Sequence, residues 1–146
     1  AALDGVAEIA IFNRDDEYYA RAEKNVDIIN NQMEGVTCKA TVHRLEDLDA
    51  LKAAIAEADI LTNGTGVGMK PLEGQSLIPD ASWLRPELIV SDVVYIPRKT
   101  RLLEMAEEAG CRTINGLGMM LYQGAKAFEM WTGQEMPVEY VKEQMF

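Results

Sequence analysis

Four polar residues, Asn13 to Asp16, directly follow the short apolar run of residues 9–12 and carry charges of both signs. In a dinucleotide-binding fold, an acidic residue at the end of the second strand accepts hydrogen bonds from the adenosine ribose hydroxyls, whereas an arginine there pairs with a 2′-phosphate. Asp16 fits the first task and Arg14 the second, so the pattern favours NAD and leaves NADP open. From spacing alone, an equally simple interpretation is that Asp15 or Asp16 caps the helix that follows.

Three glycines, Gly64, Gly66 and Gly68, follow a later apolar run in a G-x-G-x-G spacing. A phosphate-binding loop would lead into a helix whose N-terminus holds the phosphate, but this segment continues into Lys70 and Pro71. We therefore do not predict a phosphate loop here. The glycines either let the backbone approach a flat ligand or turn sharply, or they belong to an ordinary surface loop, which is the simpler interpretation.

One amide, Gln123, lies among apolar residues in a segment with helical spacing. Two neighbouring apolar stripes run along this segment, and the amide is part of one of them. Because a buried amide needs partners, we expect Gln123 to bond to a neighbouring backbone or to point at a polar ligand. The Met and aromatic residues around it, such as Met130 and Trp131, are expected in the core. Tyr95 either packs with its hydroxyl in water or donates to a ligand.

Strand-like and helix-like patterns alternate between these segments. Short apolar runs predict strands at residues 9–12, 38–42, 60–62, 88–95 and 112–115, and apolar spacings of three and four predict helices at residues 18–30, 48–58, 100–109 and 118–131. Such alternation is typical of an α/β fold with a Rossmann-like, doubly wound and mainly parallel sheet. Ligands bind at the carboxyl ends of the strands of such sheets, so the polar segments there are predicted to line one crevice. These segments are residues 13–16, 62–69, 94–97 and 115–118.

The chain has 146 residues, with 14 Lys and Arg against 24 Asp and Glu and a formal net charge of −10. This length fits a single domain, residues 1–146, and the composition is that of a globular protein. The acidic balance argues against a nucleic-acid partner, and no apolar run approaches the roughly 18 residues of a membrane span. Cys38, Cys111 and the single His43 lack metal-ligand spacing, so we expect neither zinc nor a disulfide framework, and a cytoplasmic location.

Four motifs follow one another along almost the whole chain. They are Asn13-Arg14-Asp15-Asp16, Asn63-Gly64-Thr65-x-Val67-Gly68-Met69, Asp92-Val93-Val94-Tyr95-x-Pro97-x-x-Thr100-x-Leu102-Leu103 and Gly116-x-Gly118-Met119-x-x-x-Gln123-Gly124-Ala125-x-x-Phe128-x-x-Trp131-Thr132-Gly133. In this order and spacing they resemble the C-terminal, nucleotide-binding half of the shikimate/quinate dehydrogenase family. With an aspartate at position 16, the sequence is similar to the quinate/shikimate branch of that family, which accepts NAD as well as NADP. The last motif argues against another Rossmann enzyme, such as a glutamyl-tRNA reductase.

The resemblance implies a two-domain enzyme of the shikimate pathway, which moves a hydride between nicotinamide and a ring hydroxyl of shikimate or quinate. The family's proton-transfer pair, a Lys and an Asp, belongs to its N-terminal domain, so we assign no catalytic residue in this chain. The resemblance assigns cofactor binding, with NAD favoured over NADP, to Asn13, Arg14, Asp16, Thr62, Asn63, Thr65, Val67, Val93 and Gly116. It assigns binding of the substrate's carboxylate and hydroxyl groups to Tyr95 and Gln123.

The family's first strand and its Gly-rich pyrophosphate loop would precede Ala1. In the strand order 3-2-1-4-5-6, strand one pairs with strands two and four, so a sheet without it should split and expose two edges. We therefore expect a longer natural polypeptide, whose N-terminal domain is the partner of this chain, and an inactive fragment. A second copy of the chain is a further candidate partner. Ile96 and Gly66 depart from the family pattern near the nicotinamide and the adenine. The alternative function is a non-catalytic nucleotide-binding or assembly module.

Overall fold

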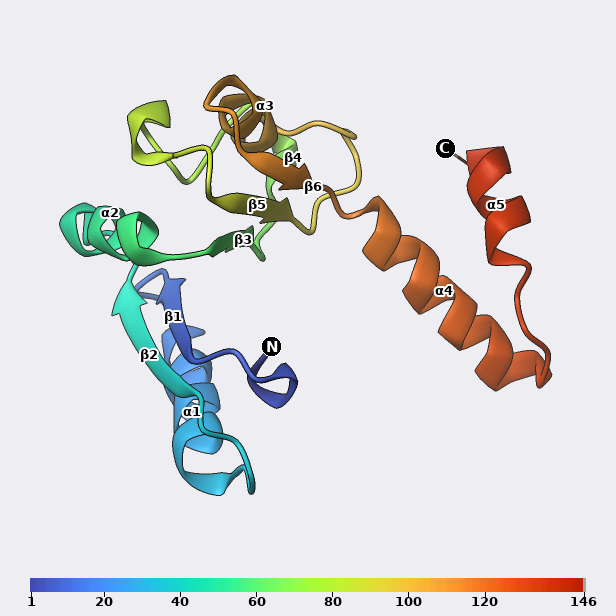
Figure 1. Cartoon of the computed structure of the whole chain (residues 1–146), viewed down its shortest axis with the longest axis horizontal. Helices are drawn as coiled ribbons and strands as arrows, with labels where there is room; N and C mark the ends of the chain where they lie inside the picture. Colours follow the sequence, from blue (N-terminus) through green and yellow to red (C-terminus); the bar gives the residue numbers. More distant parts are fainter. Residues whose placement is uncertain (146) are drawn as a thin grey trace. The chain divides into compact units, whose positions relative to one another are not determined.

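The computed structural model describes residues 1–145 and divides into two compact units, one formed by residues 1–57 and the other beginning at residue 58 (Figure 1). Strands in both units pair in parallel and alternate with helices. The predicted α/β fold with parallel strands is therefore confirmed.

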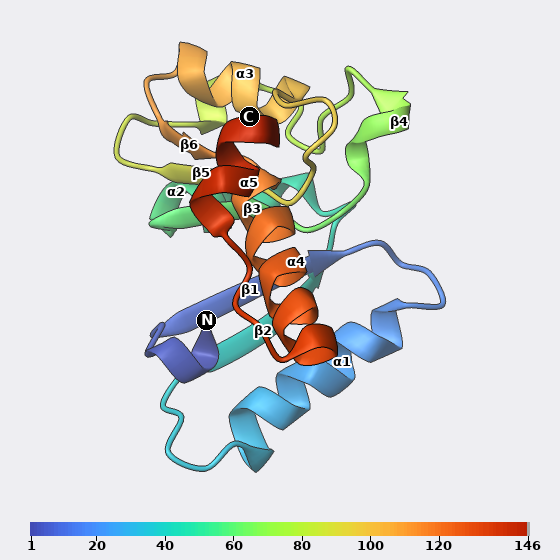
Figure 2. The ribbon, with the colours of Figure 1, turned by 90° about the vertical axis from the view of Figure 1, so that its right-hand side faces the viewer.

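The first unit contains a two-stranded parallel sheet, β1–β2. Its elements are η1 (Ala2–Asp4), β1 (Glu8–Asn13), α1 (Tyr19–Asp27), the π-helical turn η2 (Ile28–Gln32), β2 (Lys39–Arg44) and α2 (Leu48–Glu57). Helix α1 packs along the strand pair, as Figure 2 shows. The Asn30 amide fixes the end of this helical segment to β2, because it donates to the carbonyl of Ala40 at 2.9 Å and accepts from the Ala40 N–H at 2.8 Å.

The second unit contains a three-stranded parallel sheet in the order β3-β5-β6. Its elements are β3 (Ile60–Asn63), β4 (Val67–Glu73), η3 (Ala81–Trp83), β5 (Ile89–Asp92), α3 (Arg101–Glu108), β6 (Arg112–Ile114), α4 (Leu117–Thr132) and α5 (Val138–Met145). Helix α3 packs against β5 and β6 and buries its apolar stripe there. Fully buried Leu88, Val90 and Ala106 mark the centre of this core.

The described strands form two separate sheets, β1-β2 and β3-β5-β6, and this agrees with the expectation of a split sheet drawn from the strand order 3-2-1-4-5-6. Among the described residues, β1 pairs with β2 alone and β3 pairs with β5 alone, so each of them has one open edge. The order of the remaining strands agrees with the sequence prediction.

The predicted strand at residues 88–95 is shorter in the structure, where β5 ends at Asp92. The reason is local: the N–H of Val94 turns to the Asp92 carboxylate at 3.0 Å instead of continuing the ladder. Sequence patterns also missed β4 and α5. Pro137 directly before α5 was a usable signal, because proline is common at the start of helices. Across the residues described, no helix is both long and apolar enough to span a membrane.

Candidate functional site

The carboxyl end of β1 carries the first predicted group of cofactor residues. Asn13 is half-buried and its Nδ2 donates to the carbonyl of Arg14 at 3.1 Å, while Arg14 and Asp16 are exposed. One carboxylate oxygen of Asp16 accepts the N–H of Tyr18 at 2.9 Å, just before α1. This hydrogen bond forms a turn before the helix and does not cap it, because the N-cap residue of α1 is Tyr18 and no side chain caps the helix there. The alternative that Asp15 or Asp16 caps this helix is therefore wrong. The exposure of the Asp16 carboxylate leaves it accessible to a ribose.

A residue that the sequence analysis missed, Arg44, ends the neighbouring strand β2. The parallel register places it beside Asn13, and its Nη1 lies 3.0 Å from an Asp15 carboxylate oxygen. Both side chains of this ion pair are exposed. This edge therefore carries two positive charges, on Arg14 and Arg44, and two negative charges, on Asp15 and Asp16. The signal that could have found Arg44 is its position at the end of a β-prone run, because parallel strands end at the same edge.

The Asn63 side chain organises the chain at the carboxyl end of β3. Its Nδ2 donates to the carboxylate of Asp92 and to the carbonyl of Val67, both at 3.0 Å. Its Oδ1 accepts from the backbone N–H of Thr65 at 3.0 Å and from the Thr65 hydroxyl at 2.7 Å. The Thr65 Oγ1 in turn accepts the N–H of Val67 at 3.1 Å. One buried amide therefore fixes the turn that carries three predicted cofactor residues.

Asp92 and Thr100 complete this network, and the sequence analysis assigned neither to the site. Each is 1% exposed, and the Thr100 hydroxyl donates to the Asp92 carboxylate at 2.7 Å. Thr100 also accepts the N–H of Leu103 and so begins α3. Among the described residues, every buried side-chain nitrogen and oxygen has a hydrogen-bond partner. A single acidic residue inside the apolar run 88–95 was the available signal.

Gly116 brings the start of α4 against the end of β5. Its N–H donates to the Val94 carbonyl at 3.0 Å, and a Cβ built on it would lie only 2.0 Å from the carbonyl oxygen of Val93. The Val93 N–H donates to the Asn63 carbonyl at 3.1 Å. Glycine is thus required by a close backbone approach, and the ends of β3, β5 and β6 are tied together.

The structure therefore brings one group of predicted residues together within the second unit. These are Asn63, Thr65, Val67, Val93 and Gly116. Thr62, on β3, is exposed beside the group, and Tyr95 is partly exposed just after it. Asn13, Arg14 and Asp16 belong to the first unit. In the G-x-G-x-G segment only Gly68 has a positive φ, at 104°.

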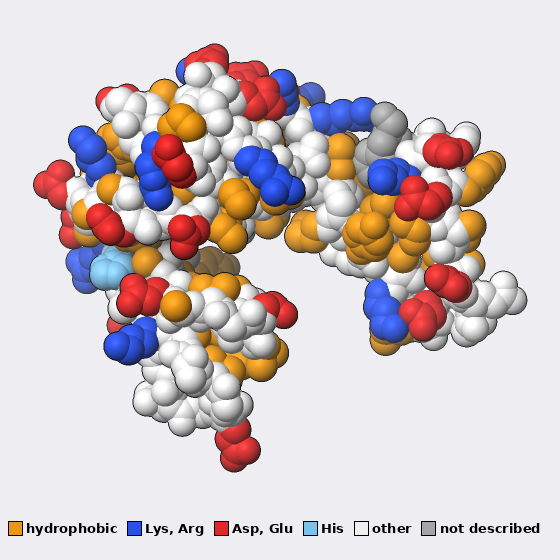
Figure 3. All heavy atoms as spheres, viewed as in Figure 1, with side chains coloured by type: hydrophobic (Ala, Val, Ile, Leu, Met, Phe, Trp, Pro, Cys, Tyr) orange, Lys and Arg blue, Asp and Glu red, His pale blue; other side chains and the backbone are white. Residues whose placement is uncertain are grey.

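The expected burial of Gln123 is wrong. Gln123 is exposed on α4, and so are the neighbours expected in the core, with Met130 at 75% and Trp131 at 84% exposed. Of the α4 residues only Leu121 is buried. Hydrophobic side chains gather over α4 and α5 on the surface in Figure 3. A periodic pattern identifies an apolar face but not the element that covers it, and within this unit α5 is the helix that packs on α4.

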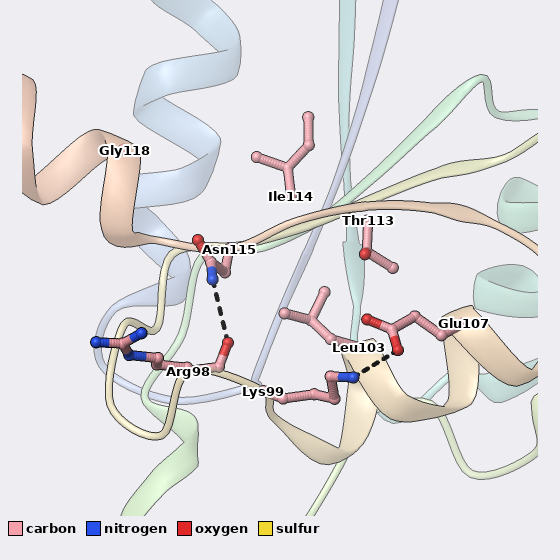
Figure 4. Close-up of a pocket in the computed structure, with 8 residues that line it drawn as sticks. All are labelled: Arg98, Lys99, Leu103, Glu107, Thr113, Ile114, Asn115 and Gly118. Carbon is pink, nitrogen blue, oxygen red and sulfur yellow. Dashed lines mark hydrogen bonds and ion pairs between the residues drawn. The ribbon is translucent and has the colours of Figure 1, made fainter. Parts of the chain in front are cut away.

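A separate pocket of about 500 Å³ lies between α3, β6 and the start of α4 (Figure 4). The Lys99 ammonium on its wall is 2.7 Å from the Glu107 carboxylate, and this hydrogen bond raises the pKa of the lysine. Asn115 donates to the Arg98 carbonyl at 3.2 Å. None of the predicted cofactor or substrate residues lines this pocket. Within the described residues, no group of three or more His, Cys, Asp and Glu side chains is placed to hold a metal ion.

Comparisons with known proteins find similarity to shikimate and quinate dehydrogenases. The family model for the shikimate 5'-dehydrogenase C-terminal domain matches residues 116–146. A shikimate dehydrogenase (NADP(+)) of Listeria monocytogenes serotype 4b (strain F2365) is 64% identical over 146 residues, which are 100% of this chain and 49% of that protein. The chain therefore spans about half the length of the curated relatives that it matches.

Two solved structures extend the comparison. Shikimate 5-dehydrogenase from Listeria monocytogenes, in complex with shikimate and NAD, superposes with a TM-score of 0.92 at 64% identity and covers 100% of this chain and 50% of its own. Quinate dehydrogenase from Corynebacterium glutamicum, in complex with NAD, gives a TM-score of 0.80 at 32% identity and covers 97% of this chain and 46% of its own. The chain is therefore homologous to the shikimate and quinate dehydrogenases and corresponds to the C-terminal region of such a protein.

Proposed function

We propose that this chain is the nucleotide-binding half of an enzyme that reversibly oxidises shikimate or quinate to its 3-dehydro form with NAD or NADP. The observation that carries the proposal is the match of the whole chain to the Listeria structure that contains shikimate and NAD. The residues expected to contact the cofactor have suitable chemistry in this structure. Asp16 presents an exposed carboxylate for ribose hydroxyls, and Gly116 has no side chain where the backbone is closely packed.

When bound, the nicotinamide cofactor accepts the hydride from the substrate or returns it. In this proposal the chain's own residues bind and orient the two reactants. Asn63 and Thr65 hold the turn that would lie along the path of the cofactor, and Val67 would face the nicotinamide. Placing the two reacting carbons in contact is itself a large part of catalysis, because it removes the entropy cost of a bimolecular encounter.

The adenosine end of the site is proposed to set the choice between NAD and NADP. The Asp16 carboxylate accepts hydrogen bonds from the ribose and repels a 2′-phosphate, which favours NAD. Arg14 offers a partner for that phosphate, so NADP is also accepted. The Listeria relatives are consistent with either cofactor, because one protein is named for NADP(+) and the matching structure contains NAD.

The substrate is proposed to bind through Tyr95 and Gln123. Both side chains are exposed and carry hydrogen-bond donors that suit the carboxylate and hydroxyls of shikimate or quinate. The family's Lys and Asp, which move the proton, would come from an N-terminal domain of the same polypeptide. We therefore expect this chain alone to be inactive.

The test is turnover by the full-length protein, measured as reduced nicotinamide formed from NAD or NADP with shikimate or with quinate. Gln123→Ala and Tyr95→Phe should raise the KM for the hydroxy acid by about tenfold or more, because each leaves a polar group of the substrate unpaired. Tyr122→Phe, at an exposed neighbouring position of α4, is the control and should behave as wild type. Cofactor binding without any turnover would favour the non-catalytic module instead, and an unchanged KM in Gln123→Ala would remove its assigned role.

A further inference from the structure

Asp92 is the one charged side chain that is buried among the residues the structure describes. Three groups contact its carboxylate: Asn63 Nδ2 at 3.0 Å, the Val94 N–H at 3.0 Å and the Thr100 hydroxyl at 2.7 Å. All three are donors. The described residues provide no arginine or lysine as an ion-pair partner for this carboxylate.

A buried carboxylate without a cation is costly for stability. Even fully hydrogen-bonded, it loses hydration that neutral partners only partly replace, and an apolar side chain often packs there with no loss of stability. The N-terminus of α3 lowers this cost, because the Thr100 hydroxyl places the carboxylate beside the positive end of the helix dipole. A residue with this cost is better explained by the geometry that it imposes than by the stability that it adds.

The contacts show which geometry that is. The Asp92 carboxylate accepts from Nδ2 of Asn63, and Oδ1 of the same amide accepts from the backbone N–H and the hydroxyl of Thr65. On the opposite side, Asp92 holds the hydroxyl of Thr100, whose Cγ2 would lie 3.0 Å from a Cβ built at Gly68. Both ends of the segment from Asn63 to Gly68 are therefore fixed. Hydrogen bonds of the Asn63 amide fix the first end, and close packing against Thr100 fixes the second.

We propose that Asp92 is a positioning residue for the nicotinamide cofactor: its buried carboxylate fixes the turn of residues 63–68 and the end of β5 in the conformation that binds the cofactor. The inference rests on the proposed function and adds a residue that touches neither cofactor nor substrate. Asp92 acts through Asn63 and Thr100.

Asp92→Asn in the full-length protein is the direct test. The amide has the shape of the carboxylate but keeps only one acceptor, so either Thr100 or the pair Asn63 and Val94 loses its acceptor. We expect the KM for NAD or NADP to rise by about tenfold or more, with kcat lowered as well, because displacement of binding groups by about an ångström costs this much. The melting temperature should also fall.

The matched control is Val90→Ala, two residues earlier on the same strand and fully buried. It should leave a cavity and lower the melting temperature, but none of the hydrogen bonds to Asp92 involves Val90. A change that only destabilises the protein removes molecules from the folded population and leaves the KM of the remainder unchanged. We therefore expect Val90→Ala to keep the wild-type KM for the cofactor.

If Asp92→Asn does not fold, a second pair of variants tests the same hydrogen bond. Thr100→Val removes the hydroxyl that donates to Asp92, whereas Thr100→Ser retains it. Thr100→Val should raise the cofactor KM, and Thr100→Ser, which keeps the hydroxyl but lacks the Cγ2 methyl beside Gly68, should raise it less. An unchanged cofactor KM in both Asp92→Asn and Thr100→Val, or the same increase in Val90→Ala, overturns the positioning role. The proposed function is tested separately, by the turnover of the wild-type protein.

Discussion

The two strand edges that carry the predicted cofactor residues are built in opposite ways. At the ends of β1 and β2, the charged side chains are exposed. Arg44 and Asp15 form an ion pair there, and Asn13 and Asp16 each form one hydrogen bond with the backbone. At the end of β3 and β5, Asn63 and Asp92 are buried and every donor has an acceptor. One edge is a set of solvated charges, and the other is a closed hydrogen-bond network.

In the proposed nucleotide site, this difference would separate two tasks. Exposed charges can exchange one partner for another without disturbing the packing, so we expect ligand preference to be adjustable at the first edge. Buried polar groups cannot lose a partner cheaply, because an unsatisfied donor costs about 1–3 kcal/mol. Geometry is therefore fixed at the second edge. Substitutions at the second edge should affect folding and binding together, whereas those at the first edge should affect ligand choice alone.

The largest effect is expected for Gly116→Ala. The new Cβ would lie 2.0 Å from the Val93 carbonyl oxygen and 2.9 Å from the carbonyl carbon of Val94, both of which are backbone atoms that cannot rotate away. We expect a loss of about 3 kcal/mol or more in the free energy of unfolding, measured by urea denaturation of the full-length protein. Gly118→Ala is the control, because its Cβ meets nothing within 4 Å and alanine favours the helix. Equal stability of the two variants would break the comparison.

Gly68→Ala should have the next largest effect. Gly68 combines a φ of 104° with a Cβ position 3.0 Å from Thr100 Cγ2, so alanine is strained by the backbone and crowded by its neighbour. We expect a loss of about 1–3 kcal/mol in the free energy of unfolding, together with a higher KM for the cofactor. Gly66→Ala, whose Cβ would meet only Met69 at 3.8 Å, should be close to wild type. A Gly68→Ala variant that binds the cofactor normally would show that this turn tolerates movement.

The difference between the edges also explains what the sequence could predict. Strands β1, β2, β3 and β6 follow from short apolar runs, and the limits of α3 follow from Thr100 and Gly110, because these are local signals. The link between Asn63 and Asp92 joins residues 29 positions apart, which no local pattern reveals. The exposure of Trp131 depends on what packs against α4, and periodicity carries no information on that.

At the first edge, Asp16→Asn should change ligand choice with little effect on folding. Asparagine keeps an oxygen for the Tyr18 N–H but removes the charge that repels a 2′-phosphate. We expect the ratio of kcat/KM for NADP to kcat/KM for NAD to rise by about tenfold, with unfolding unchanged. Glu17→Gln removes the same charge one residue later and serves as the control. An equal rise in that variant would assign the preference to the overall charge of the edge rather than to Asp16.

The smallest effect is expected for the ion pair between Arg44 and Asp15. Both side chains are exposed and their atoms lie 3.0 Å apart, so water and salt screen the attraction. A double-mutant cycle with Arg44→Gln and Asp15→Asn should give a coupling free energy below about 1 kcal/mol, and the coupling should fall further as salt is added. Because both side chains are exposed, the ion pair can break without loss of packing, and Arg44 could then bind a phosphate of the proposed nucleotide instead. A coupling of about 2 kcal/mol or more, insensitive to salt, would mean that this edge is as rigid as the buried one.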